Sequence, residues 1–305
     1  RDIRNRALEN LDLWLERFEQ EATRRGARVH WARDAAEANA IIVGIAQANG
    51  VKKVVKSKSM VSEECGLNDA LEAAGVTPVE TDLGEYILQI NDHEPPSHIV
   101  APVIHKTRDE VSDLFHAKHG KPRTEDIGAL CREAREILRP HFLSADMGIS
   151  GANFLVAETG STVIVTNEGN GRLCTTVPRI HVALTGIEKV VPTLEDLSVL
   201  LRLLPRSATG QPITNYVSMN TGIAGNGDSD GPEQFHIVLL DNGRSRVLGS
   251  ELKEMLRCIR CGACMNHCPV YQAVGGHAYG WVYPGPMGSV LTPSYAGMEH
   301  AHELP

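Results

Sequence analysis

The feature that most constrains this chain is a run of four cysteines near its C-terminal end. Cys258, Cys261, Cys264 and Cys268 are separated by two, two and three residues, and Pro269 follows the last of them. This spacing is typical of bacterial ferredoxins, in which the thiolates hold a 4Fe–4S cluster. Cysteines two residues apart can converge from one tight loop onto neighbouring corners of a cube. The sequence therefore predicts a 4Fe–4S site on these four residues.

A zinc site and a disulfide framework are the alternatives to a cluster. Zinc loops usually bring two CxxC pairs together from separated positions. A disulfide framework would need an oxidising compartment and more cysteines than the seven present. A cluster motif instead indicates a reducing compartment, so we expect a cytoplasmic protein.

The fourth cysteine raises the question of a second cluster, because in two-cluster ferredoxins it ligates the other cluster. Residues 269–305 contain no cysteine, and the chain begins at Arg1 rather than at a methionine. Either the protein continues beyond Pro305, or Cys268 completes a single cluster, or a remote cysteine supplies a ligand. We expect the first, with two clusters in the intact protein and a fragment here. The other cysteines, which we expect to be buried or inert, are Cys65, Cys131 and Cys174.

Composition excludes two classes of partner. A net charge of −8 with a pI near 5.9 argues against a nucleic-acid-binding protein, which would normally carry a basic surface. No apolar run approaches the roughly 20 residues that a membrane-spanning helix needs. The remaining composition is that of an ordinary globular protein, with 42% hydrophobic and 22% charged residues.

The first half of the chain alternates between strands and amphipathic helices at a spacing of about 25 residues. The expected strands cover 29–32, 53–56 and 77–80, and the expected helices cover 3–24, 35–48, 62–74 and 82–90. Asp34, Ser62 and Asp82 are the expected N-caps. This alternation predicts an α/β fold with a parallel sheet whose faces are covered by helices. Two more helices, at 107–115 and 124–138, each open on a threonine and form a helical cover or an excursion from that pattern.

The second half adds further strands and then changes character. Strands are expected at 154–157, 162–165, 180–184, 216–219 and 237–240, with a helix at 194–204. The first two are joined by a tight turn, and a glycine-rich polar loop at 167–172 follows them. A boundary near Ser250 divides the chain into an α/β domain at 1–249 and an incomplete ferredoxin-type segment at 250–305. We expect irregular structure over 270–305, which is rich in glycine and proline.

One candidate ligand site lies at Lys58 and Ser59. They follow the strand at 53–56, at its carboxyl end and just before a helix, which is where ligands bind in open α/β sheets. The ordinary interpretation is that the lysines of this region form a solvated edge of the sheet, and binding of an anionic ligand is the alternative. These lysines are Lys52, Lys53, Lys56 and Lys58.

A second candidate site is the stretch from 158 to 172. Arg172 could bind a carboxylate through a bidentate fork, and Glu158 or Glu168 could take up a proton. Residues that could donate hydrogen bonds to a ligand are Thr159, Asn167 and Asn170. Alternatively, the glycines and asparagines form only a turn, because they tolerate left-handed backbone conformations. His181 is expected to be a structural histidine.

Long stretches of the chain resemble one family. They are 56–68, 80–89, 96–106, 157–184 (AETGSTVIVTNEGNGRLCTTVPRIHVAL), 186–197, 230–245 and 258–271 (CIRCGACMNHCPVY). With them the chain resembles the type B iron–sulfur proteins of lactate utilisation, whose N-terminal part is a LUD domain. The resemblance implies an α/β LUD domain similar to the sugar-phosphate isomerase and CoA-transferase folds (NagB/RpiA-like). A truncated ferredoxin-like 4Fe–4S segment follows it.

The resemblance also implies a function. Members of the family belong to an assembly that oxidises L-lactate to pyruvate, together with a cysteine-rich iron–sulfur protein and a second LUD-domain protein. No flavin or nicotinamide signature is present, so we expect an electron-transferring subunit of a non-flavin L-lactate dehydrogenase complex, with a small carboxylate as a possible ligand. The alternative is an isomerase- or transferase-like domain for a phosphorylated or CoA-linked molecule, with a structural cluster.

Overall fold

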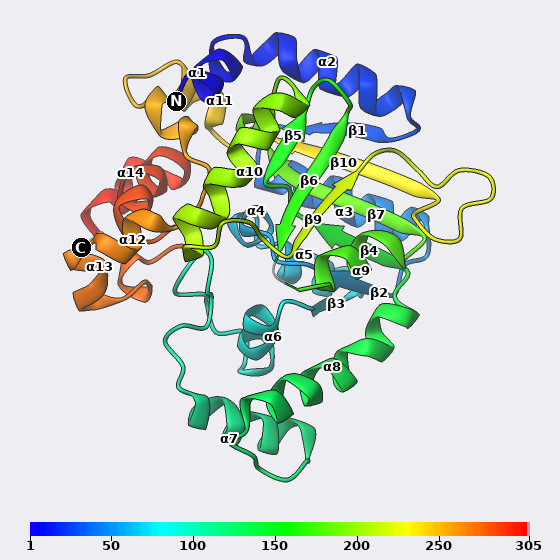
Figure 1. Ribbon diagram of the computed structural model, residues 1–305, viewed down its shortest axis with the longest axis vertical. Coiled ribbons are helices and arrows are strands. Elements are labelled where there is room, and N and C mark those ends of the chain that lie inside the picture. The colour runs from blue at the N-terminus through cyan, green and yellow to red at the C-terminus, as the bar shows by residue number, and fades with distance from the viewer. Residues whose placement is uncertain (167, 304–305) are drawn as a thin grey trace.

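The computed structural model describes residues 1–166 and 168–303, and a six-stranded parallel sheet lies at its centre (Figure 1). The strand order is β1-β10-β7-β4-β2-β3. The strands are β1 (Arg28–Ala32), β2 (Lys53–Lys56), β3 (Thr77–Glu80), β4 (Met147–Ser150), β7 (Ile180–Gly186) and β10 (Gln234–Leu240). The predicted α/β class with a parallel sheet is confirmed.

Helices cover both faces of this sheet, as parallel sheets require. Along β10, Val238 and Leu240 point to one face, whereas Ile237 and Leu239 point to the other, because side chains alternate along a strand. The first face packs on α3 (Ala35–Ala48) and α5 (Leu67–Ala73), and the second on α2 (Leu11–Arg24). The prediction of one helix over 3–24 is wrong, because Asn10 leaves the helical conformation and separates α1 (Asp2–Glu9) from α2.

A second sheet of four strands lies beside the first (Figure 1), in the order β8-β5-β6-β9. Its strands are β5 (Phe154–Val156), β6 (Ser161–Thr166), β8 (Val190–Val191) and β9 (Tyr216–Asn220). The predicted turn joins β5 to β6, and its Gly160 has a φ of 66°. A Cβ there would lie 2.2 Å from the backbone nitrogen of Ala22, so only glycine lets α2 approach the turn. Helix α10 (Leu194–Thr209) packs on this sheet.

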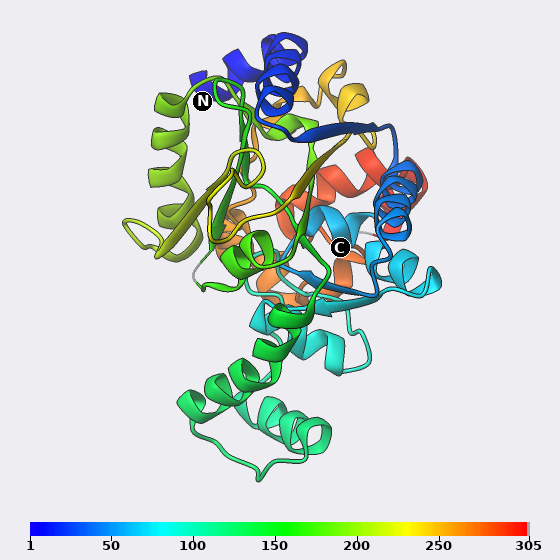
Figure 2. The ribbon, with the colours of Figure 1, turned by 90° about the vertical axis from the view of Figure 1, so that its right-hand side faces the viewer.

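The predicted excursion forms a separate arm (Figure 2), made of α7 (Arg108–His119) and α8 (Ile127–Ser144), next to α6 (Leu83–Ile90). Thr107 forms a capping box with Glu110 at the start of α7. The predicted threonine cap of α8 is wrong, because Asp126 accepts the hydrogen bond from Ala129. Phe115 and Leu130 lie in one hydrophobic cluster with Val55 of β2, which holds the arm against the sheet.

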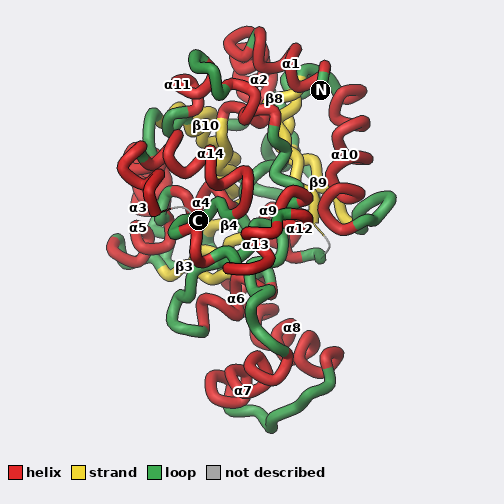
Figure 3. Tube along the Cα trace, turned by 90° about the vertical axis from the view of Figure 1, so that its left-hand side faces the viewer, coloured by secondary structure: helices red, strands yellow, loops and turns green. Residues whose placement is uncertain are grey.

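The C-terminal segment folds into short helices (Figure 3), and this includes the described part of 270–305, where irregular structure was predicted. They are α11 (Arg244–Leu248), η2 (Lys253–Arg257), α12 (Ala263–His267), α13 (Pro269–Val274), η3 (His277–Tyr279), α14 (Gly285–Ala296) and η4 (Met298–Glu303). Their core contains Tyr283 and Leu291 together with Leu8 and Ile99, so the segment packs directly on the α/β domain. No helix in the described part of the chain is long and apolar enough to cross a membrane.

Candidate functional site

The four cysteines of the run lie on one loop and its flanking short helices. Arg260 and Gly262 have φ angles of 60° and 78°, which turn the backbone between Cys258 and α12. The backbone N–H of Arg260 donates to Cys258 Sγ at 3.4 Å, and that of Tyr271 donates to Cys268 Sγ at 3.4 Å. Such N–H···S bonds are among the interactions that tune iron–sulfur clusters.

The four cysteines are free thiols, so no disulfide joins them. They come from one short segment of the chain, and thiolates are the ligands that hold iron–sulfur clusters.

The remote cysteines lie elsewhere in the fold. Cys65 and Cys174 belong to hydrophobic clusters on either side of β2, and burial raises the pKa of each to about 12. Cys131 is exposed on α8, so of the two expected alternatives, buried or inert, burial is excluded for it. None of the three lies in the hydrophobic cluster that contains Cys258.

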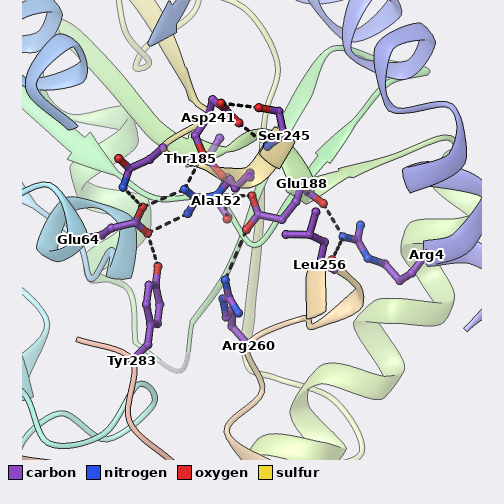
Figure 4. Close-up of polar contacts among 12 residues, drawn as sticks. Arg4, Glu64, Ala152, Thr185, Glu188, Asp241, Ser245, Leu256, Arg260 and Tyr283 are labelled. Carbon is purple, nitrogen blue, oxygen red and sulfur yellow. Dashed lines mark hydrogen bonds and ion pairs between the residues drawn. The ribbon is translucent and has the colours of Figure 1, made fainter. Parts of the chain in front are cut away.

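A buried ionic network connects the cysteine segment to the α/β domain (Figure 4). The guanidinium of Arg244 donates to both carboxylate oxygens of Glu64, at 2.9 and 2.8 Å, and to Glu188 Oε2 at 2.7 Å. Tyr283, from the cysteine segment, donates its hydroxyl to Glu64 Oε2 at 2.7 Å. Burial opposes ionisation of Glu188, yet Arg244 and its neighbours lower the pKa of this carboxyl to about 2.

Arg4 and Arg260 extend the same network. Arg4 donates to the backbone carbonyls of Val190, at 3.0 Å, and Leu256, at 2.7 Å. The Arg260 guanidinium lies 4.8 Å from the centre of the Tyr283 ring and 3.8 Å from Glu188 Oε1 (Figure 4). We call this network, together with Lys189, which interacts electrostatically with Glu188, the basic core. Its members are Arg4, Glu64, Glu188, Lys189, Arg244, Arg260 and Tyr283.

The basic core holds more positive than negative charge. It contains four cationic side chains and two carboxylates, an excess of two positive charges when all are ionised. Burial lowers the pKa of Lys189 to about 8, which shows how costly a further cation is there. Arg4, Lys189 and Arg260 all interact electrostatically with Cys258, so this excess lies near a thiolate that would carry part of the charge of a cluster.

A cavity of about 450 Å³ lies between the α/β domain and the cysteine segment. Its floor is formed by residues just beyond the carboxyl ends of four parallel strands. These residues are Lys58 after β2, Asp82 after β3, Gly151 after β4 and Lys189 after β7. The other walls come from β6, the end of α10, residues 99–103 and, from the cysteine segment, Arg260 and Tyr283.

Lys58 is a cation of the cavity without a hydrogen-bonding partner among the described residues. Its Nζ is shielded from solvent. Burial lowers the pKa of Lys58, although the carboxylates of Glu85 and Asp82 act in the opposite direction. Ser59 lies beside it and caps α4 (Met60–Glu64) by accepting from Ser62 N, so the predicted cap at Ser62 is wrong by one turn.

Two carboxyl groups in or near the cavity have raised pKa values. Burial and the nearby Asp82 raise the pKa of Glu168, which lines the cavity. Burial, with Glu63 and Glu80, raises the pKa of Glu85 to about 8, and Glu85 Oε1 has no partner among the described residues. A raised pKa favours the protonated form of each of these two groups.

Comparison with known proteins identifies the larger domain. The model of the LUD domain matches residues 15–240, and a 4Fe–4S dicluster domain model matches residues 254–303. The chain belongs to the LUD domain family. The second match supports an iron–sulfur cluster on the cysteine segment.

Relatives of similar sequence carry both parts. Lactate utilization protein B of Shouchella clausii is 52% identical over 304 residues, and that of Bacillus subtilis is 50% identical over 304 residues. Each alignment covers 100% of this chain and 64% of the relative, so the chain spans about two thirds of their length. A solved DUF162 family protein from Deinococcus radiodurans aligns at a TM-score of 0.39 and 14% identity, over 76% of this chain and 98% of that one.

The LUD domain brings only some of the predicted ligand-binding residues to the cavity. Lys58, Ser59 and Glu168 line it. Glu158 instead accepts a hydrogen bond from Leu194 N at the start of α10, at 2.8 Å. Thr159 pairs with Ser161, with 2.8 Å between their hydroxyl oxygens.

The predicted loop at 167–172 is partly helical. Helix α9 (Asn170–Thr176) begins inside it and carries Asn170 and Arg172 away from the residues that line the cavity. Arg172 is exposed and its guanidinium lies 5.4 Å from the centre of the Tyr216 ring. Asn167 lies outside the described residues.

The expectation that the lysines around β2 form a solvated edge of the sheet is wrong for Lys56 and Lys58. Strand β2 lies inside the sheet, between β4 and β3, and the Lys56 side chain is 1% exposed. Its Nζ lies 2.7 Å from both Glu63 Oε1 and Glu80 Oε1. Burial alone would lower the pKa of Lys56, but these two carboxylates raise it.

Sequence reasoning missed Lys189 and Arg260. Lys189 follows β7 at the same edge of the sheet as Lys58, so the rule used for Lys58 would have found it. Arg260 had a signal in its position, because it lies between two cluster cysteines. His181 fits the expected structural role: Ser150 Oγ lies 2.8 Å from its Nε2, and its ring stacks on Phe235.

Proposed function

We propose that this chain is the iron–sulfur electron-transfer part of an L-lactate-oxidising system in the cytoplasm. The observation that carries the proposal is that both parts of the chain line one cavity. Arg260 and Tyr283 of the cysteine segment contribute to its lining together with residues of the LUD domain. A ligand in that cavity would therefore lie beside the cysteine loop. The name of the relatives, lactate utilization protein B, supports lactate as the substrate that is oxidised.

Oxidation of L-lactate to pyruvate releases two electrons and two protons. A cluster on Cys258, Cys261, Cys264 and Cys268 would accept and pass on single electrons. The basic core would stabilise the added negative charge, because it carries an excess of cations next to the loop. The remaining expectations of the resemblance belong to this proposal: a second cluster in the whole protein, a cysteine-rich partner, a second LUD-domain partner and a NagB/RpiA-like fold.

Anaerobic reconstitution of the full-length protein tests the proposal. Iron and sulfide are counted, and the EPR spectrum is followed during L-lactate addition, with and without the two partner proteins. Reduction by lactate only with partners would support an electron relay, and reduction by lactate alone would place the oxidation on this chain. A filled cluster that never responds to lactate would contradict the proposal.

The second candidate is an isomerase- or transferase-like domain with a structural cluster. It is favoured by the position of the cavity at the carboxyl ends of parallel strands, where phosphorylated ligands often bind. Binding of a sugar phosphate or a CoA ester, with no effect of lactate on the cluster, would support this candidate.

A further inference from the structure

We infer that the cavity is a binding site for a small carboxylate, with Lys58 holding the carboxylate and the wall of Lys189 and Arg260 facing it. The choice of lactate and pyruvate as probes rests on the proposed function. The anion site itself rests on the geometry alone, so the two can fail separately.

Lys58 differs from the other lysines around β2. Lys53 donates its Nζ to Ser144 Oγ at 3.1 Å, and Lys56 is held by two carboxylates. Lys58 Nζ has no hydrogen bond or ion pair within the described residues, although it is buried. An unpaired buried ammonium costs several kcal/mol in folding, so a protein rarely retains one without a ligand to compensate it.

The place of Lys58 in the topology is that of a ligand-binding residue. After β2 the chain moves outward to β3, whereas β4 is followed by β7 on its other side, so the strand order diverges between β2 and β4. Crevices at such divergence points bind ligands in open α/β sheets. Gly151, just after β4, keeps the crevice open, because a Cβ there would lie 3.0 Å from Ser59 Oγ.

The other residues that line the cavity favour a small anionic ligand. Lys189 and Arg260 line the cavity, and both belong to the basic core with its excess of positive charge. Apolar side chains cover much of the rest, among them Ile87, Ile99 and Ile164. A cavity of about 450 Å³ lies in the lower part of the range for small-molecule sites. A short hydroxy or keto acid combines the required charge with a methyl group for the apolar wall.

Proton uptake should accompany binding. The groups that act on Lys58 are Asp82, Glu63, Glu85, Glu168 and His98. A bound carboxylate would raise the lowered pKa of Lys58 and raise the pKa of Glu168 further, so both effects take up protons. The affinity should therefore fall as the pH rises.

Isothermal titration of the reconstituted full-length protein tests the site with L-lactate and pyruvate, and with lactamide as an uncharged analogue. The variant is Lys58→Met, and the control is Lys52→Met, which removes an exposed lysine outside the cavity. We expect saturable binding of the carboxylates but not of lactamide. We also expect about a 10-fold or greater loss of affinity in Lys58→Met alone.

Wild-type protein that binds neither carboxylate, or equal affinity in Lys58→Met and Lys52→Met, would overturn the inference. If Lys58→Met does not hold its cluster, or its circular dichroism spectrum shows that it is unfolded, the site is tested on the wild type instead. Titrations in two buffers of different ionisation enthalpy then measure the number of protons taken up on binding. Carboxylate binding with proton uptake supports the site, and indifference between lactate and lactamide refutes it. If lactate binds but does not reduce the cluster in the EPR experiment, the site is supported and the proposed function fails. If lactate reduces the cluster of Lys58→Met as in the wild type, the proposed function is supported and the site at Lys58 fails.

Discussion

Two buried ionic groups flank the cavity, and they are built in opposite ways. Around Lys56, one cation pairs with two carboxylates, those of Glu63 and Glu80. Burial raises the pKa of Glu80, so a proton on this carboxyl can balance the excess negative charge. In the basic core, cations outnumber carboxylates, and an arginine charge cannot be removed by losing a proton at ordinary pH. The first group can be neutral by itself. The second needs an external negative charge, and the cysteine loop lies next to it.

The largest expected effect comes from the basic core. Arg244→Met leaves Glu64 and Glu188 buried without their main cation, at a cost of about 3–5 kcal/mol in the free energy of unfolding. Denaturant unfolding measures the loss, with exposed Arg202→Met as the matched control. A loss below about 1 kcal/mol would mean that the network contributes little to stability.

A smaller loss of stability is expected for a substitution at Lys56, and comparison with Lys58 tests whether the two lysines have different roles. Lys56→Met should cost about 2–3 kcal/mol, because a proton on Glu80 offsets part of the lost cation. Lys58→Met should leave the stability within about 1 kcal/mol of wild type or raise it, because it removes an unpaired buried ammonium. Equal destabilisation by the two substitutions would show that Lys58 is a structural residue like Lys56.

The pH dependence of stability should reveal the acidic side of the cavity. The pKa of Glu85 is raised by burial to about 8, so its contribution to stability is fully present below the unfolded value of about 4.5. That contribution is lost as the pH rises through about 8. The melting temperature should therefore fall by a few degrees between pH 6 and 9 in the wild type, and Glu85→Gln should flatten this slope. Glu72→Gln, at an exposed position of α5, should keep the wild-type slope.

The sequence predicted those parts of the molecule that depend on local patterning. Strands β1, β2 and β3, the turn at Gly160 and the cysteine loop all follow from periodicity, turn chemistry or spacing over a few residues. Strand order could not be predicted in the same way. Lys56 looks solvated in an isolated strand, and it is buried only because β2 lies between β4 and β3.

The site shows the same limit over longer distances. Lys58 and Arg260 are about 200 residues apart in the chain, so only the packed structure brings them to one cavity. The helices after residue 269 were missed for another reason: α14 begins at a Gly-Pro pair, which looks like a break but suits the first turn of a helix. Tertiary packing of Tyr283 and Leu291 then outweighs the weak local propensity.

The smallest effect is expected at Arg172, which the sequence favoured as the carboxylate-binding residue. The structure places its guanidinium over the ring of Tyr216 on β9, and not among the residues that line the cavity. Arg172→Ala should therefore change stability by about 0.5–1 kcal/mol through the lost cation–π contact. Lactate affinity and the KM of the assembled complex should remain at wild-type values, in contrast to Lys58→Met. A rise in KM for Arg172→Ala but not for Lys58→Met would indicate that the carboxylate binds on the β9 side of the LUD domain and not in the cavity. Titration of both variants with L-lactate distinguishes the two positions.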